Sequence, residues 1–123
     1  MSTLNTALST ALSGMNAAQT LLSVTANNIA NSNTPGYTDE SVDLTALPDG
    51  GVGVDGIYPS EGDINDDGDN GDLALQMSNL SNARNLYNAN AAVVNITNQM
   101  YGSLLDMMDN EDDQDSDQDD IPL

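Results

Sequence analysis

The sequence lacks several residue types on which catalytic and metal sites depend. Its 123 residues include no cysteine, histidine, phenylalanine or tryptophan. Without cysteine there are no disulfides or thiolate ligands, and without histidine there is no imidazole for catalysis or metal binding. A compact enzyme core usually contains large aromatic side chains. We therefore expect one domain at most, no catalytic residues and no bound cofactor.

Positive charge is almost absent. One arginine, Arg84, stands against twenty acids, and the formal net charge is −19. Nucleic acids and anionic membranes both require a basic surface, so neither is an expected partner. No apolar run approaches the ~20 residues that span a bilayer, which argues against membrane insertion. The N-terminus also lacks the basic and apolar regions of a secretory signal.

The acids are strongly segregated. Residues 1–38 contain no charged side chain, and residues 73–105 contain only Arg84. All the acids fall between residues 39 and 72 or from Asp106 onward. A free surface helix normally carries charges of both signs, so the two uncharged segments suggest helices that pack on more than one side.

A seven-residue repeat predicts a first helix over residues 3–32. The repeated apolar residues are Leu8, Met15, Leu22 and Ile29. The same repeat predicts a second helix over residues 73–108, with Leu80, Tyr87, Val94 and Tyr101 on one line and Leu105 on the intervening position. Such a seam is typical of a helix that packs lengthwise on another helix. A second apolar line lies beside it, formed by Leu86, Val93, Met100 and Met107.

Between the helices, the pattern changes to alternation. Val42, Leu44 and Ala46 alternate with polar residues, and a turn at 48–51 precedes a second alternating run. This predicts a short β-hairpin. The expected fold is mainly α: two long antiparallel helices forming a coiled coil, with a β-hairpin or irregular acidic middle. The expected parts are the N-terminal helix and turn (1–37), the acidic linker (38–72), the C-terminal helix (73–108) and a disordered acidic tail (109–123).

The first helix ends in an asparagine-rich stretch. Asn27, Asn28, Asn31 and Asn33 are four asparagines within seven positions. Asparagine is a mediocre helix former but suits helix ends, turns and hydrogen-bonded contacts. Asn27 and Asn31 are one turn apart, so their amides share a face. Pro35 disfavours the helical backbone at the residue before it, and Gly36 permits a positive φ, so a sharp reversal is predicted there. We interpret the stretch as a helix end and as part of an assembly interface, together with the seam residues named above.

The acidic middle contains half of a calcium-binding loop. Asp63, Asn65, Asp67 and Asp69 alternate around Gly68, as in the first half of an EF-hand loop. The second half fails, because Ala74 stands where a bidentate glutamate is needed. A specific Ca²⁺ site and a plain acidic turn both remain open, and no other cofactor is indicated.

Two stretches carry a family resemblance. The first is ALSTALSGMNAAQ at 7–19, followed by ANNIANSNTPGY at 26–37. The second spans Asp72 to Asp106. Together they resemble the terminal signatures of bacterial flagellar rod, hook and hook-associated axial proteins, most closely a small proximal-rod type. The motif residues are Asn28, Ala30, Asn33, Thr34, Pro35, Gly36 and Tyr37.

The resemblance implies a structural subunit of the flagellar basal body. Such proteins leave the cytoplasm through the flagellar type III export apparatus without a cleaved signal. Their terminal helices then pack into a helical, periplasm-spanning assembly with further copies and with other rod or hook proteins. Two departures stand out: Gln76 replaces a usual glutamate, and the acidic tail is not part of the pattern. An acidic calcium-binding module and a non-flagellar coiled-coil oligomer are the alternatives.

Overall fold

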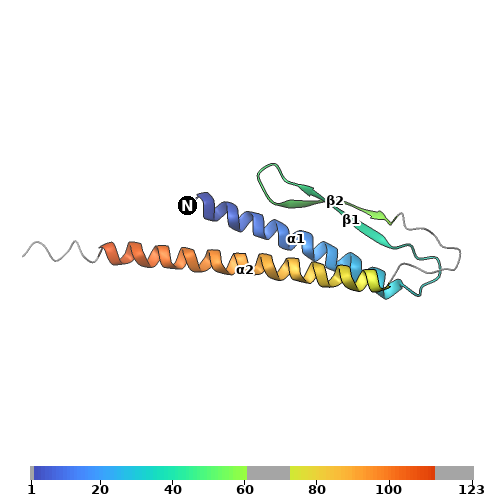
Figure 1. Ribbon diagram of the computed structural model, residues 1–123. Helices are drawn as coiled ribbons and strands as arrows, with labels where there is room; N and C mark the ends of the chain where they lie inside the picture. Colours follow the sequence, from blue (N-terminus) through green and yellow to red (C-terminus); the bar gives the residue numbers. More distant parts are fainter. Residues whose placement is uncertain (1, 61–72, 113–123) are drawn as a thin grey trace, which may run out of the picture.

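The computed structural model describes residues 2–60 and 73–112, and it is elongated. Its elements are α1 (Ser2–Asn31), β1 (Glu40–Ala46), β2 (Val52–Pro59) and α2 (Leu73–Asp112). At about 1.5 Å per residue, the helices are roughly 45 and 60 Å long. Figure 1 shows α1 and α2 running antiparallel, with the hairpin on the other side of α1. The predicted mainly α fold with a hairpin is confirmed.

The helix boundaries differ slightly from the prediction. α1 begins and ends one residue earlier than the predicted span 3–32. α2 extends to Asp112, four residues past the predicted end at 108, so the predicted tail 109–123 begins inside a helix. Asn110 donates to the Asp106 carbonyl at 2.7 Å within that last stretch. The segment 105–112 contains no proline or glycine that would end the helix earlier.

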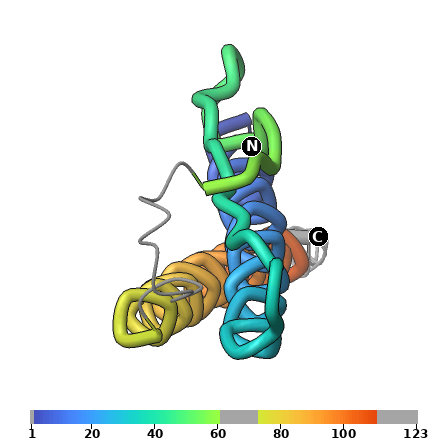
Figure 2. The backbone as a smooth tube through the Cα atoms, turned by 90° about the vertical axis from the view of Figure 1, so that its right-hand side faces the viewer, coloured from blue at the N-terminus to red at the C-terminus, as the bar shows by residue number. Residues whose placement is uncertain are grey.

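α1 is the central element, because it packs against both α2 and the hairpin. Figure 2 looks along the long axis and shows the hairpin on one side of α1 and α2 on another. The buried apolar side chains are small, namely Ala11, Ala17, Ala18, Val24 and Ala83. Small side chains let the elements approach closely but bury little apolar area. The core is therefore a thin layer along α1.

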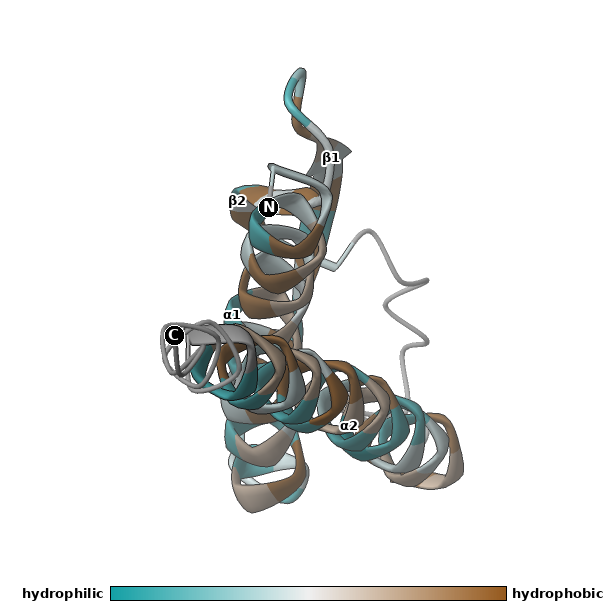
Figure 3. Cartoon of the chain, turned by 90° about the vertical axis from the view of Figure 1, so that its left-hand side faces the viewer, coloured by the Kyte–Doolittle hydropathy of each residue, from teal (hydrophilic) through white to brown (hydrophobic). Residues whose placement is uncertain are grey.

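The helix pair is fixed near both ends by polar contacts. Near one end, the Tyr101 hydroxyl donates to Oδ1 of Asn5 at 2.6 Å. Near the other, Nδ2 of Asn28 donates to Oε1 of Gln76 at 3.3 Å. The helix axes cross visibly in the end-on view (Figure 3). The antiparallel pairing is as expected, whereas the supercoiling of a true coiled coil stays a prediction.

The hairpin is antiparallel and carries one β-bulge. Asp43 pairs with Gly56 and Leu44 with Val54, which leaves Asp55 as the extra residue. Its turn docks on α1, where the backbone N–H of Val52 donates to Oγ of Ser13 at 3.1 Å. Gly51 has a φ of 98° and lies directly against Ser13, so a side chain at this turn position would meet both strain and a clash.

Candidate functional site

The asparagine-rich end of α1 forms a buried polar cluster around Asn28. Asn28 is 1% exposed and is the largest fully buried side chain in the described part of the chain. Its Nδ2 donates to the Glu40 carbonyl at 2.8 Å and to Oε1 of Gln76 at 3.3 Å. Its Oδ1 accepts from the Tyr37 hydroxyl at 2.9 Å and from the Glu40 N–H at 3.0 Å. The amide thus makes all four hydrogen bonds that its chemistry allows.

The turn after α1 brings Tyr37 back to this cluster. The Tyr37 N–H donates to the Thr34 carbonyl at 3.1 Å, closing a turn with Pro35 second and Gly36 third. Gly36 has a φ of 78°, as a type II turn requires at that position. The reversal predicted for this proline–glycine pair is observed. It lets the tyrosine hydroxyl return to the helix that it has just left.

Tyr37 is half-buried and lies close to two acidic side chains. Burial raises the pKa of its hydroxyl above the ordinary value of 10.0, and the nearby Glu40 and Asp39 carboxylates raise it further. Burial and negative neighbours both disfavour the tyrosinate anion. At neutral pH the hydroxyl therefore keeps its proton and donates to Asn28.

The cluster extends to α2 through Asp39. Asp39 is 8% exposed, and its Oδ2 accepts from Nε2 of Gln76 at 2.9 Å. The Asp39 carbonyl accepts from the Ser60 N–H at 2.7 Å, which continues the hairpin pairing beyond β1 and β2. Its Oδ1 is buried and without a hydrogen-bond partner. One cluster thus joins α1, the turn, the hairpin and α2.

Asn27 and Asn31 were the asparagines predicted to lie at an interface, whereas the fold buries Asn28. Asn31 donates from Nδ2 to Oδ1 of Asn27 at 3.0 Å, so these two amides do share a face. That face is largely solvent-accessible: Asn27 is exposed and Asn31 half-buried. Their role in an assembly interface stays a prediction. Of the other motif residues, Ala30, Asn33, Thr34, Pro35 and Gly36 are exposed.

Sequence reasoning missed Asp39 and Gln76 as members of the cluster. In the sequence, Gln76 stands out only as a departure from a family pattern. A second signal was present, because position 76 lies four residues before the seam residue Leu80. A polar side chain on the helix face that carries an apolar seam is expected to be buried with that seam. A buried amide in turn needs hydrogen-bond partners.

The predicted seam is half-buried and the line beside it is exposed. The half-buried residues are Leu8, Met15, Leu22 and Ile29 on α1 and Leu80, Tyr87, Val94 and Tyr101 on α2. Leu86, Val93, Met100 and Met107 lie on a neighbouring face of α2 and are 41–66% exposed. Leu105 is 65% exposed. Apolar positions recur along the full length of α2, as the brown segments of Figure 3 show.

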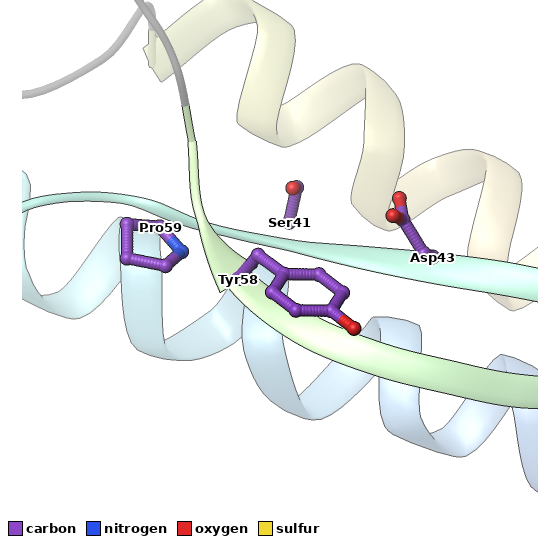
Figure 4. Close-up of a pocket in the computed structure, with 4 residues that line it drawn as sticks. All are labelled: Ser41, Asp43, Tyr58 and Pro59. Atoms are coloured by element: carbon purple, nitrogen blue, oxygen red, sulfur yellow. The ribbon is translucent and has the colours of Figure 1, made fainter.

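Two of the surface depressions on residues 2–60 and 73–110 lie outside the cluster, and neither is lined by a catalytic set of side chains. One, of about 680 Å³, lies on the hairpin (Figure 4), where Ser41 and Asp43 extend from β1 and Tyr58 and Pro59 from β2. The other, of about 400 Å³, follows α2 past the side chain of Arg84. Within residues 2–60 and 73–110, Arg84 forms no ion pair.

The possible calcium ligands Asp63, Asn65, Asp67 and Asp69 lie outside the described residues. Where the structure is described, no group of three or more acidic side chains could hold a metal ion. Among the helices of that part, none is long and apolar enough to cross a membrane.

One known protein family matches the segment that contains Asn28. Residues 8–38 match a family described as flagella basal body rod protein. The match supports the flagellar rod family. The expected resemblance to rod proteins is therefore supported over residues 8–38, and with it a structural role in the flagellar basal body. The rod-family segment covers α1 from Leu8 and the turn through Tyr37, so it includes Asn28. No curated protein matches the chain.

Proposed function

We propose that this chain is a structural subunit of the axial rod or hook of the bacterial flagellum. The observation that carries the proposal is the rod-family match over residues 8–38, the segment that contains Asn28 and Tyr37 of the cluster. In this view the chain is exported through the type III apparatus and assembles with further copies and with other rod or hook proteins. The rod would place it across the periplasm.

The second apolar line of α2, together with Ala89 and Ile96 between its members, supports the proposal that the chain assembles with other subunits. Leu86, Ala89, Val93, Ile96 and Met100 follow one another at spacings of three and four residues, and all are exposed. This is the spacing of a second packing seam. α1 occupies the neighbouring face of α2, so the second seam is open to a helix of another subunit. Contiguous exposed apolar side chains of this kind mark protein interfaces.

The charge distribution supports the same proposal. Helix faces buried between subunits should be neutral, because an unpaired charge is costly to bury. α1 has no charged residue, whereas the hairpin carries exposed acids at Glu40, Asp43, Asp49 and Asp55. The hairpin would then face outward and the helices inward.

The decisive experiment is mass spectrometry of purified hook–basal bodies from motile cells that express the chain. We expect its peptides in a fixed ratio to the other axial proteins. A matched preparation from cells that lack the gene controls for contamination. If the chain is absent from the intact bodies of motile cells, the proposal is wrong.

A further inference from the structure

The side-chain amide of Gln76 forms one hydrogen bond on each side, and each partner has a fixed role as donor or acceptor. It is 8% exposed and lies between Asn28 of α1 and Asp39 at the start of the hairpin. Its Oε1 accepts from Nδ2 of Asn28 at 3.3 Å, and its Nε2 donates to Oδ2 of Asp39 at 2.9 Å. α2 thus reaches the rest of the cluster through one side-chain amide.

Neither neighbour can reverse its role. The backbone of Glu40 orients Asn28, because the carbonyl of Glu40 accepts from Nδ2 at 2.8 Å and its N–H donates to Oδ1 at 3.0 Å. Asn28 therefore presents a donor toward residue 76. The carboxyl group of Asp39 has no N–H, and its Oδ2 accepts from Nε2 of Gln76. Residue 76 must accept from one side and donate to the other, and the side-chain amide of Gln76 does both.

We propose that Gln76 is a specificity-determining residue for closure of the helix pair, and that Asp39 sets its identity. An α2 helix with glutamine at this position closes onto α1 and the hairpin. A helix with glutamate there is rejected, since it lacks the donor and brings a second carboxylate against Asp39. The pair selects which C-terminal helix can close the fold, which goes beyond the structural role proposed above.

The same geometry predicts that the two positions can exchange chemistry. In the double variant Asp39→Asn/Gln76→Glu, the amide introduced at position 39 would donate to one oxygen of the carboxylate introduced at position 76. Asn28 would donate to the other oxygen of that carboxylate. The double variant loses one acid and gains one, so its formal net charge stays at −19. It separates the local pairing from any effect of total charge.

The test compares the full chain with Gln76→Glu, Asp39→Asn, the double variant and Gln76→Leu in urea unfolding followed by circular dichroism. At pH 7.5, Gln76→Glu should lower the folding equilibrium constant roughly 10- to 100-fold, and the double variant should recover to within about threefold of wild type. Gln76→Leu should also lose stability, and adding Asp39→Asn to Gln76→Leu should not restore it.

A second readout covers variants that are too unstable for unfolding curves. The chain has no cysteine, and a Cβ at Gly14 would lie 2.7 Å from Cγ of Asn90. Oxidation of a Gly14→Cys/Asn90→Cys pair therefore reports the closed register in a dilute monomer. Cross-linking should slow in Gln76→Glu and recover in the double variant. Wild-type behaviour of Gln76→Glu, or a loss that Asp39→Asn does not rescue, overturns the proposal. Neither measurement depends on entry into a flagellum.

Discussion

At the scale of single residues, the rod-family motif acts through one buried amide. Asn28 makes four hydrogen bonds to three segments that are distant in sequence or follow a turn. Its neighbour Asn27 is exposed and contacts Asn31 and the Tyr37 hydroxyl. Two adjacent residues of the same type therefore contribute differently to the free energy of unfolding, because burial makes each unmade hydrogen bond costly.

Replacing each asparagine in turn tests this difference. Asn28→Ala should lower the free energy of unfolding by about 2–4 kcal/mol, since it removes the hydrogen bonds to the Glu40 backbone and to the buried side chain of Gln76. Asn27→Ala should change it by no more than about 0.5 kcal/mol, as expected for an exposed site. Urea unfolding of both variants at neutral pH gives the comparison. Equal losses would contradict the assignment of Asn28 as the buried anchor.

Tyr37 should give the protein an alkaline limit. Because its pKa is raised in the folded state, the folded chain holds the hydroxyl proton more tightly than the unfolded chain does. Its contribution to stability is complete below pH 10 and should be lost as the pH rises through the folded-state pKa. Thermal unfolding between about pH 8 and 12 measures the decline.

Tyr37→Phe supplies the matched variant. It should be less stable than wild type at pH 8 by about 1 kcal/mol, because the bond to Asn28 is lost. It should then show a smaller decline above pH 10. Tyr58→Phe, at an exposed position of β2, is the control and should decline as wild type does. A wild-type decline in Tyr37→Phe would assign the alkaline limit to other groups.

At the scale of elements, close approach matters more than side-chain volume. Gly14 of α1 lies against Asn90 of α2, and a methyl group at Gly14 would come within 2.6 Å of Nδ2 of Asn90. Gly102, further along α2, has no atom within 4 Å of the corresponding position. One glycine makes room for the partner helix and the other only weakens its own helix.

Alanine at these two glycines should act in opposite directions. Gly102→Ala should stabilise the chain by roughly 0.5–1 kcal/mol through helix propensity. Gly14→Ala should destabilise it by about 1 kcal/mol, since Asn90 must move from its place. In an Asn90→Ala background, Gly14→Ala should become neutral or stabilising. Chemical unfolding of these variants tests this, and a loss that persists in that background would exclude the Asn90 contact as its cause.

At the scale of the whole molecule, the chain leaves much of its apolar surface uncovered. α1 has 30 residues and α2 has 40, and the described hairpin packs on α1. The second seam of α2 and the end of that helix around Leu105 are therefore exposed. A monomer of this shape is expected to be marginally stable and to gain stability by association.

Polar substitutions on the second seam should separate assembly from folding. Val93→Asn with Met100→Gln should leave the helix content and unfolding midpoint of the monomer nearly unchanged, because both sites are exposed. The pair should reduce incorporation into hook–basal bodies and swimming in soft agar. Asn98→Gln, at an exposed polar position on α2, is the control. Normal incorporation of the double variant would exclude this seam from the assembly interface.

Much of the fold could be predicted from the sequence because it depends on local patterns. The seven-residue repeats located both helices, and Pro35 with Gly36 located the turn. The alternation from Val42 to Val54 located the hairpin. The predicted end of α2 at residue 108 was four residues too early, because acidic repulsion and helix propensity compete along 106–112.

The sequence by itself determined the neutral helices, the segregated acids and a rod-family segment, because periodicity and charge are properties of neighbouring residues. The tertiary structure decided that Asn28, rather than Asn27 or Asn31, is the buried anchor, and that its cluster includes Asp39 and Gln76. Those residues lie 11 and 48 positions further along the chain. Only the folding of the turn and of α2 against α1 brings their donors and acceptors together, and burial then fixes which of them must pair.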